Sequence, residues 1–370
     1  MFCHLFIMAH TSMQTSKILH SLASRKDQDN DSNSSSKFVS CDLCLGCSIC
    51  SSSDEDDIYG IPFSVKTSRA EFEANYIEIY KIARGGFGAV YAGYRMKDVA
   101  SVAIKHIPKE KVHYSEVVKN GKVYKVIAEV ALMMKAAGGA ESLGRSAAIS
   151  LLDCYDLEEE LLLITERPVL SMDLHRYHKA KRGFLPEDEA KTILRQMVDA
   201  AIEMHTNGVF HRDIKLKNTL IETGSHVPRA RVIDFGCGCL VIKGYYYHYS
   251  GTLSKAPPEW FMFKRYEASP TTVWQQGALL YNLLDHDYSF KTSRYLERGI
   301  KINLNLSIDC LEFLQMCLVR NPDRRPSLEQ LQLHPWLRYN PCHTTCSFAK
   351  CGLGIIQEEE LEGTQTSPNQ

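Results

Sequence analysis

The sequence has no uninterrupted apolar run approaching the roughly 20 residues that a membrane-spanning helix requires, so no membrane span is expected. It also lacks an excess of charge of either sign. Its 43 basic and 44 acidic residues leave a formal net charge of −1, which argues against a protein that binds nucleic acid along its surface. The apolar start, residues 1–9, has no basic segment before it, so a secretory signal is not expected.

Cysteine is present but not concentrated. Thirteen cysteines, an odd number, are spread over 370 residues and do not form the dense framework of a small secreted domain, which indicates a reducing compartment. We expect a cytoplasmic protein, with the nucleus as a further location. Cys41, Cys44, Cys47 and Cys50 repeat every third residue, a spacing typical of neither structural zinc nor iron–sulfur sites. Unpaired thiols are the default interpretation, with acylation, redox sensitivity and metal binding as alternatives.

Composition divides the chain into three parts. Residues 1–72 form an arm rich in Ser, Asp and Cys, residues 339–370 form a polar tail, and both are predicted to be disordered because they offer little apolar surface to bury. Residues 76–338 instead show strong periodicity. The predicted strands are 76–82, 90–94, 101–107 and 161–165, with a hairpin at Asn120-Gly121; the predicted helices are 126–137, 186–205, 274–284 and 308–318.

A glycine-rich segment, Arg84-Gly85-Gly86-Phe87-Gly88-Ala89-Val90, lies between two of these strands. Glycines let backbone amides approach phosphate oxygens without a Cβ in the way. The segment is not a Rossmann fingerprint, because a strand follows it, and not a Walker loop, because no Gly-Lys-Ser/Thr ends it. Alone, such a segment is more often an ordinary turn than a nucleotide site.

Lys105 follows Val102-Ala103-Ile104 on the next strand. A lysine that alternates with buried neighbours needs a negative partner if it is to keep its charge. Glu129, in the predicted helix 126–137, is the only acidic residue between positions 117 and 140 and is therefore the expected partner. Lys105 is thus either a surface cation or the cation for the α- and β-phosphates of a nucleotide.

Two further motifs lie in the C-terminal half. His211-Arg212-Asp213-Ile214-Lys215-Leu216-Lys217-Asn218 precedes Asp234-Phe235-Gly236, and Pro257-Pro258-Glu259 follows. With the glycine-rich segment and the strand lysine in this order, the chain resembles the eukaryotic protein kinases. The resemblance implies an α+β, bilobal protein-kinase fold. A small β-rich N-lobe (about 76–165) would carry one regulatory helix, and the larger C-lobe (about 169–338) would be mainly helical.

The resemblance also implies transfer of the γ-phosphate of ATP to Ser or Thr hydroxyls of a protein or peptide substrate by a monomeric enzyme. Asp213 would orient the hydroxyl, Lys215 would neutralise the γ-phosphate, and Thr252 would bridge the two. Asn218 and Asp234 would bind Mg²⁺, and Glu259 would pair with Arg325. The ATP site is expected to include Lys105, Glu129, Ile82, Ala83, Arg84, Gly85, Gly86, Phe87, Gly88, Ala89, Val90, Ala103, Thr165, Glu166, Pro168, Asp173, Leu220 and Ile233.

Leu163-Ile164-Thr165-Glu166-Arg167-Pro168 is similar to the hinge of the PIM kinases, with Thr165 at the gatekeeper position. Pro168 has no N–H, so adenine is expected to be held by one backbone hydrogen bond, to the Glu166 carbonyl. Pro257-Pro258-Glu259-Trp260, Val273-Trp274 and His334-Pro335-Trp336 are further similarities. The resemblance also implies activity without phosphorylation of the activation segment.

The chain departs from the usual protein-kinase pattern in three places, one of which, the missing Asp at Thr272, is also seen in PIM kinases. Ala83 replaces the first glycine of the phosphate loop, and Thr272 stands where most kinases have Asp; we expect altered ATP affinity from the first. PIM kinases favour basic peptides through acidic residues. Asp173 keeps one such position, but Arg176, Leu216 and Lys217 occupy the others, so the peptide preference is predicted to be weaker or shifted.

Some interpretations stay open on the sequence alone. Tyr245, Tyr246 and Tyr247 are candidate phosphorylation sites or packing residues, and Cys237 and Cys239 are packing residues or thiols that could sensitise the ATP site to oxidation. A catalytically weak kinase-fold scaffold that binds nucleotide and partners is the main functional alternative, supported by Ala83 and the unusual substrate-site charges. A small-molecule kinase is disfavoured by the peptide-platform segment, residues 251–259.

Overall fold

The computed structural model describes residues 64–119, 122–138, 142–285, 290–299 and 306–338. The elements below belong to one unit, Met1–Leu337, and Arg338–Gln370 forms a second. The predicted disorder of residues 1–63 and 339–370 and the cluster Cys41–Cys50 therefore lie outside the described residues.

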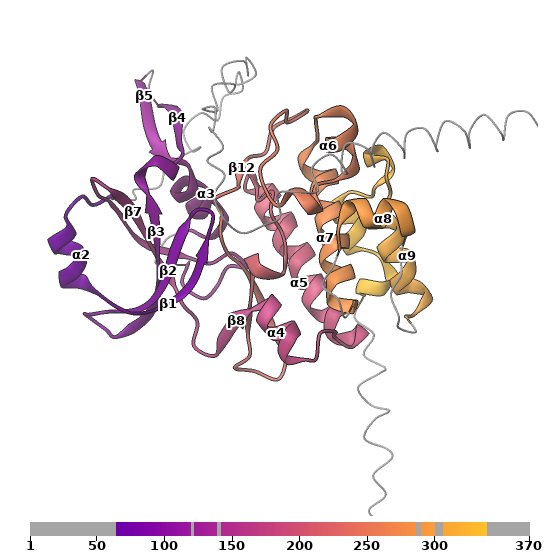
Figure 1. The fold of residues 1–370 in the computed structure, drawn as a ribbon, viewed down its shortest axis with the longest axis horizontal. Helices are drawn as coiled ribbons and strands as arrows, with labels where there is room; N and C mark the ends of the chain where they lie inside the picture. The colour runs from indigo at the N-terminus through magenta and orange to yellow at the C-terminus, as the bar shows by residue number, and fades with distance from the viewer. Residues whose placement is uncertain (1–63, 120–121, 139–141, 286–289, 300–305, 339–370) are drawn as a thin grey trace, which may run out of the picture. The chain divides into compact units, whose positions relative to one another are not determined.

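The N-lobe is built on a five-stranded antiparallel sheet in the order β1-β2-β3-β7-β6 (Figure 1). The strands are β1 (Tyr76–Gly85), β2 (Gly88–Arg95), β3 (Ala100–Pro108), β6 (Leu151–Asp156) and β7 (Glu160–Glu166). Val102 and Ile104 are fully buried, as their alternation with polar neighbours predicts. The edge strand β1 is mostly exposed, because only one of its sides has a partner strand.

A separate ladder pairs β4 (Tyr114–Lys119) with β5 (Lys122–Ile127). Lys119 faces Lys122 across the predicted turn, whose two residues are outside the described part. Helix α3 (Ala128–Ala137) follows directly. The prediction of a helix from residue 126 was wrong by two positions, because Val126 and Ile127 complete β5 by pairing with Ser115 and Tyr114.

A short helix, α2 (Arg69–Asn75), precedes the sheet. Ser68 caps its N-terminus by accepting a hydrogen bond from the Glu71 N–H. Its Phe72 is buried and packs edge-on against Tyr155 of β6, with ring centroids 5.4 Å apart. The predicted disordered arm therefore extends too far, because residues 64–72 already belong to the folded part.

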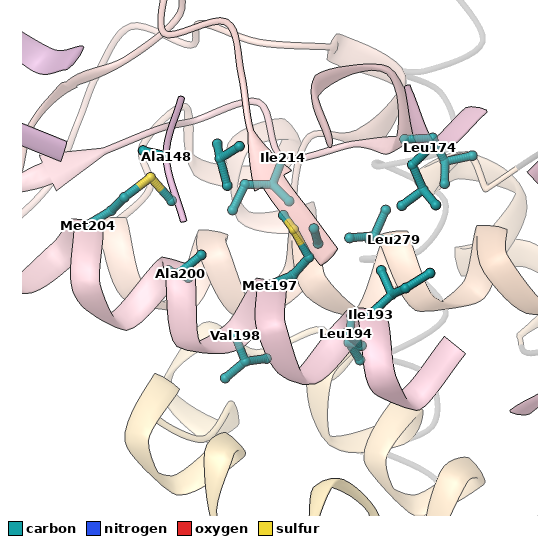
Figure 2. Close-up of a cluster of buried hydrophobic side chains, with 14 of the residues drawn as sticks. Ala148, Leu174, Ile193, Leu194, Met197, Val198, Ala200, Met204, Ile214 and Leu279 are labelled. Atoms are coloured by element: carbon teal, nitrogen blue, oxygen red, sulfur yellow. The ribbon is translucent and has the colours of Figure 1, made fainter. Parts of the chain in front are cut away.

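The C-lobe is formed around α5 (Glu187–Thr206) and α7 (Ala268–Leu284). Apolar residues recur along α5 at the three- and four-residue spacing of one helix face, and Figure 2 shows Ile193, Met197 and Met204 among the buried side chains of this core. Pro186 caps α5 rather than belonging to it, and Pro270 is accommodated in the first turn of α7. The remaining helices are α4 (Leu174–Ala180), α6 (Pro258–Phe263), α8 (Thr292–Arg298), α9 (Ile308–Cys317) and α10 (Leu328–Gln332).

Two small sheets hold the loops of the C-lobe. One has the order β11-β10-β8, formed by β8 (Ser171–Asp173), β10 (Thr219–Glu222) and β11 (Arg229–Val232), and the other pairs β9 (Val209–Phe210) with β12 (Cys239–Leu240). The segment with Asp213 lies between β9 and β10, and the segment with Asp234 lies between β11 and β12. The pairing of these strands therefore brings the two acidic motifs together.

Candidate active site

The glycine-rich segment forms the hairpin between β1 and β2, closed by the pairing of Gly85 with Gly88. A Cβ added at Gly85 or Gly86 would have no atom within 4 Å, whereas one at Gly88 (φ +146°) would lie 1.8 Å from the His106 carbonyl oxygen of β3. The first two glycines leave open space for a ligand, and the third permits close approach of two strands. Ala83 lies opposite Val90 and is not among the residues with positive φ, so its methyl group causes no backbone strain here.

Lys105 lies between two carboxylates. Its Nζ is 2.7 Å from Glu129 Oε1 and 2.7 Å from Asp234 Oδ1, so the predicted pair with Glu129 is present and Asp234 joins it. Burial alone would lower the pKa of the Lys105 ammonium, but the two carboxylates outweigh burial and raise it. Burial opposes ionisation of Asp234 as well, yet Lys105 holds the pKa of this carboxyl below its ordinary value. The three groups therefore form a partly buried charged cluster that spans β3, α3 and the loop after β11.

A second cluster surrounds Asp213, which is buried. Lys215 Nζ lies 2.5 Å from Asp213 Oδ2 and 2.8 Å from Thr252 Oγ1, and the Thr252 N–H donates to Asp213 Oδ1 over 2.8 Å. Thr252 thus bridges Asp213 and Lys215, as the sequence predicts. A Cβ at Gly251 (φ +121°) would lie 2.6 Å from the Arg212 carbonyl oxygen, so a glycine is needed to bring Thr252 this close.

Asn218 and Asp234 each have one side-chain oxygen that no donor among the described residues reaches. Asn218 Nδ2 donates to the Asp213 carbonyl oxygen over 2.9 Å and to its Oδ2 over 3.1 Å, and Asp234 Oδ1 accepts from Lys105. Asn218 Oδ1 and Asp234 Oδ2 accept no hydrogen bond from the residues that the structure describes. Two such oxygens fit a hard divalent cation that also takes phosphate oxygens. Within the described ranges no group of three His, Cys, Asp or Glu residues could hold a metal alone.

The backbone is strained at two residues of these clusters. Arg212 (φ 65°) and Asp234 (φ 66°) both have left-handed backbone conformations. For a residue other than glycine this conformation costs about 1–3 kcal/mol of free energy. The Arg212 side chain donates to the Gly238 carbonyl oxygen over 3.0 Å and to that of Cys237. His211 Nε2 lies 3.1 Å from the Ile233 carbonyl oxygen. These contacts tie the Asp213 loop to the Asp234 loop and hold both conformations.

The expected hinge carries a buried charge network that the sequence did not indicate. The Glu166 carboxylate accepts from the N–H groups of Ser150 (2.8 Å) and Gly144 (3.0 Å) and pairs with Arg231. The Arg231 side chain is fully buried and also contacts Glu222 at 2.9 Å. Glu166 is therefore anchored by its side chain.

The other expected ATP-site residues lie on neighbouring elements of both lobes. Ala103 of β3 pairs with Thr165 of β7, and Leu220 of β10 pairs with Asp173 of β8. The Ile233 N–H donates to the Asn218 carbonyl oxygen over 3.0 Å, which connects this set to the Asp213 loop. Pro168 follows Arg167, whose N–H donates to Ser101 of β3 over 3.2 Å.

The residues expected to face a peptide differ from their predicted arrangement. Asp173 caps α4 through the Arg176 N–H (2.9 Å) and pairs with the Arg176 guanidinium (3.2 Å). The same guanidinium reaches the Ile82 carbonyl oxygen at the base of the glycine-rich hairpin, over 3.1 Å. Leu216 is buried in the C-lobe core, so the prediction that it influences peptide charge was wrong. Lys217 is exposed.

The tyrosines of the segment after β12 have different environments. Tyr246 stacks on Tyr266 with centroids 5.4 Å apart, and its hydroxyl donates to the Leu240 carbonyl oxygen over 2.8 Å. Tyr245 and Tyr247 are exposed. The middle tyrosine is thus a packing residue, and its two neighbours are accessible.

Two further predictions concern Glu259 and the cysteines. Glu259 and Arg325 form a buried bidentate pair at 2.8 and 2.7 Å, as expected. Cys237 is buried and free, and burial raises the pKa of its thiol to about 11. At neutral pH this thiol is protonated, which favours the packing interpretation over a reactive group.

Comparison with known proteins agrees with this geometry. Residues 76–337 match the protein kinase domain family. The chain is 35% identical over 275 residues to the serine/threonine-protein kinase pim-2 of Danio rerio, covering 74% of this chain and 87% of that protein. It is 32% identical over 276 residues to the serine/threonine-protein kinase prk-2 of Caenorhabditis elegans, covering 73% of this chain and 59% of that one. None of the described helices is long and apolar enough to cross a membrane.

Proposed function

The chain belongs to the protein kinase family, and from this premise we propose that it is a PIM-like, Mg²⁺-dependent kinase that transfers the γ-phosphate of ATP to Ser and Thr hydroxyls of proteins. The observation that carries the proposal is the joint presence of two charged clusters, Lys105–Glu129–Asp234 and Asp213–Lys215–Thr252. A scaffold that only binds nucleotide does not need the Asp213–Lys215–Thr252 cluster, because this cluster would act on the acceptor hydroxyl and the transferred phosphate.

Each group has a task that follows from its contacts. Lys105, held by Glu129, binds phosphate oxygens of ATP, and the open space at Gly85 and Gly86 receives them under the hairpin. Asp213 accepts a hydrogen bond from the substrate hydroxyl and aligns its oxygen with the γ-phosphate. Lys215 stabilises the negative charge that shifts during transfer, and Thr252 fixes the position of both side chains.

Asn218 and Asp234 would hold the magnesium ion through the oxygens that no protein donor occupies. When bound, magnesium neutralises and orients the phosphate oxygens. The buried Glu166–Arg231 pair keeps the hinge backbone in place, so that the Glu166 carbonyl can accept a hydrogen bond from adenine. Pro168 offers no second donor.

Transfer of labelled γ-phosphate by the purified full chain tests the proposal. Asp213→Asn replaces the carboxylate by a neutral amide that cannot take up the hydroxyl proton, and we expect phosphate incorporation to fall about a hundredfold or more. Asp199→Asn is the matched control, because Asp199 is an exposed residue of α5 whose side chain contacts only Gln332 in the described structure; it should retain wild-type activity. Equal incorporation by wild type and Asp213→Asn would refute catalysis, and nucleotide binding without transfer would identify a scaffold.

A further inference from the structure

Lys255 places a second lysine close to the catalytic loop. It ends the short 3₁₀ turn Leu253–Lys255, directly after Thr252, which contacts both Asp213 and Lys215. Burial and the neighbouring Lys215 lower the pKa of Lys255 to about 8, while Asp213 opposes this shift. The ammonium therefore lies near the acceptor site in surroundings that make its charge costly.

The residues that the structure describes offer this ammonium little compensation for its burial. Its one hydrogen bond among the described residues runs to the Phe290 carbonyl oxygen over 3.4 Å, at the long end of the hydrogen-bond range. Asn282 of α7, which accepts from the Phe290 N–H over 3.0 Å, is neutral. No ion pair joins Lys255 to a carboxylate within the ranges that the structure describes. A partly buried cation that no described carboxylate pairs with has paid part of its desolvation cost without a compensating ion pair, so binding of an anion from outside would be favourable.

Two further basic residues lie on the catalytic loop and on α4. Lys217 is exposed in the catalytic loop, two residues after Lys215. Arg176 is also largely exposed and neutralises Asp173, the one acidic position that could attract a basic peptide. Asp213 itself is already bound by Lys215 and Thr252. A peptide with basic side chains next to its acceptor hydroxyl would meet repulsion on this face.

We propose that this kinase selects substrates in which an acidic or already phosphorylated side chain lies close to the acceptor serine or threonine, and that Lys255 binds this anion, with Lys217 adding to the attraction. The inference rests on the proposed kinase activity and specifies its substrate class. The chain itself contains a sequence of this class, Ser51-Ser52-Ser53-Asp54-Glu55-Asp56-Asp57, and a synthetic peptide of this sequence is a suitable probe.

The test is a positional peptide library phosphorylated by the full chain, in which each position around one acceptor serine carries Ala, Asp, phosphoserine or Arg in turn. We expect at least one position where Asp or phosphoserine raises kcat/KM about tenfold over Arg, as one charge-assisted hydrogen bond would. Comparison of the phosphoserine peptides with the Asp peptides shows whether the site prefers a phosphate group or a carboxylate. The probe peptide should be phosphorylated better than the same peptide with its four acidic residues changed to Ala.

Variants then assign the preference to Lys255. Lys255→Met should reduce the ratio of Asp to Arg turnover about tenfold, Lys255→Arg should retain it, and Lys255→Glu should favour Arg. Lys179→Met, at an exposed position of α4, should leave the ratio unchanged. Transfer that prefers Arg, or shows no charge preference, in the wild-type library would overturn the inference and leave the kinase activity intact. Absence of transfer to every peptide and protein tested would instead refute the proposed function.

Discussion

Gly86 and Gly88 of the glycine-rich hairpin have different surroundings, so substitutions at the two positions should have different effects. At Gly88 a Cβ would lie 1.8 Å from the His106 carbonyl oxygen and 3.0 Å from its carbonyl carbon. Both atoms are backbone, so relief requires β2 and β3 to separate next to the Ala89–His106 pair. Overpacking costs about 1–3 kcal/mol, and a side chain at φ +146° adds about 1–3 kcal/mol. We expect Gly88→Ala to lower the free energy of unfolding by about 2–6 kcal/mol.

Gly86→Ala is the matched comparison. No atom lies within 4 Å of its added Cβ, so its free energy of unfolding should stay within about 0.5 kcal/mol of wild type. Its methyl group would instead enter the space proposed for the phosphates, and KM for ATP should rise about tenfold. Urea unfolding followed by circular dichroism measures the first quantity, and steady-state kinetics at varied ATP measures the second. The reasoning fails if both variants are equally stable, or if Gly86→Ala leaves KM for ATP unchanged.

Two further predictions concern buried charges. Glu259→Gln leaves the Arg325 guanidinium buried without its carboxylate and should lower the free energy of unfolding in urea by about 3–5 kcal/mol. Adding Arg325→Met in a double variant should restore part of this loss. A loss below about 1 kcal/mol for Glu259→Gln would contradict the prediction. Burial lowers the pKa of His205 from 6.5 to about 4, so the unfolded chain binds a proton between these values while the folded chain does not. Stability should therefore fall by up to about 3 kcal/mol as pH drops from 6.5 to 4, and His205→Gln should remove that part of the decline; identical pH profiles for both proteins would exclude it.

The elements that the sequence predicted well are those with local signals. The alternation at Val102 and Ile104 and the helical spacing along α5 depend on neighbours within one element. The motifs around Asp213 and Asp234 were identifiable because the order of functional residues along a kinase chain is diagnostic. The pairing of Lys105 with Glu129 could be inferred for a simpler reason, since no other acidic residue was available nearby.

What could not be predicted depends on contacts between distant segments. Helix α2 has only seven residues and gains its stability from Phe72 against Tyr155, which no local pattern reveals. The burial of Arg231 between Glu166 and Glu222 requires two elements far apart in the chain. The absence of a carboxylate partner for Lys255 in the described structure is likewise visible only once Phe290 and its surroundings are placed.

The Arg176 side chain connects helix α4 of the C-lobe to the Ile82 carbonyl oxygen of the N-lobe. A hinge motion that moves the glycine-rich hairpin away from α4 must break this hydrogen bond. This hydrogen bond is exposed, and a contribution of at most about 1 kcal/mol would correspond to no more than roughly a fivefold shift toward the arrangement in which the hairpin and α4 are in contact. We therefore expect a surface arginine that has no contact with Lys105, Asp213 or Asp234 in the described structure to slow the opening of the lobes and the release of ADP, without altering the chemistry of transfer.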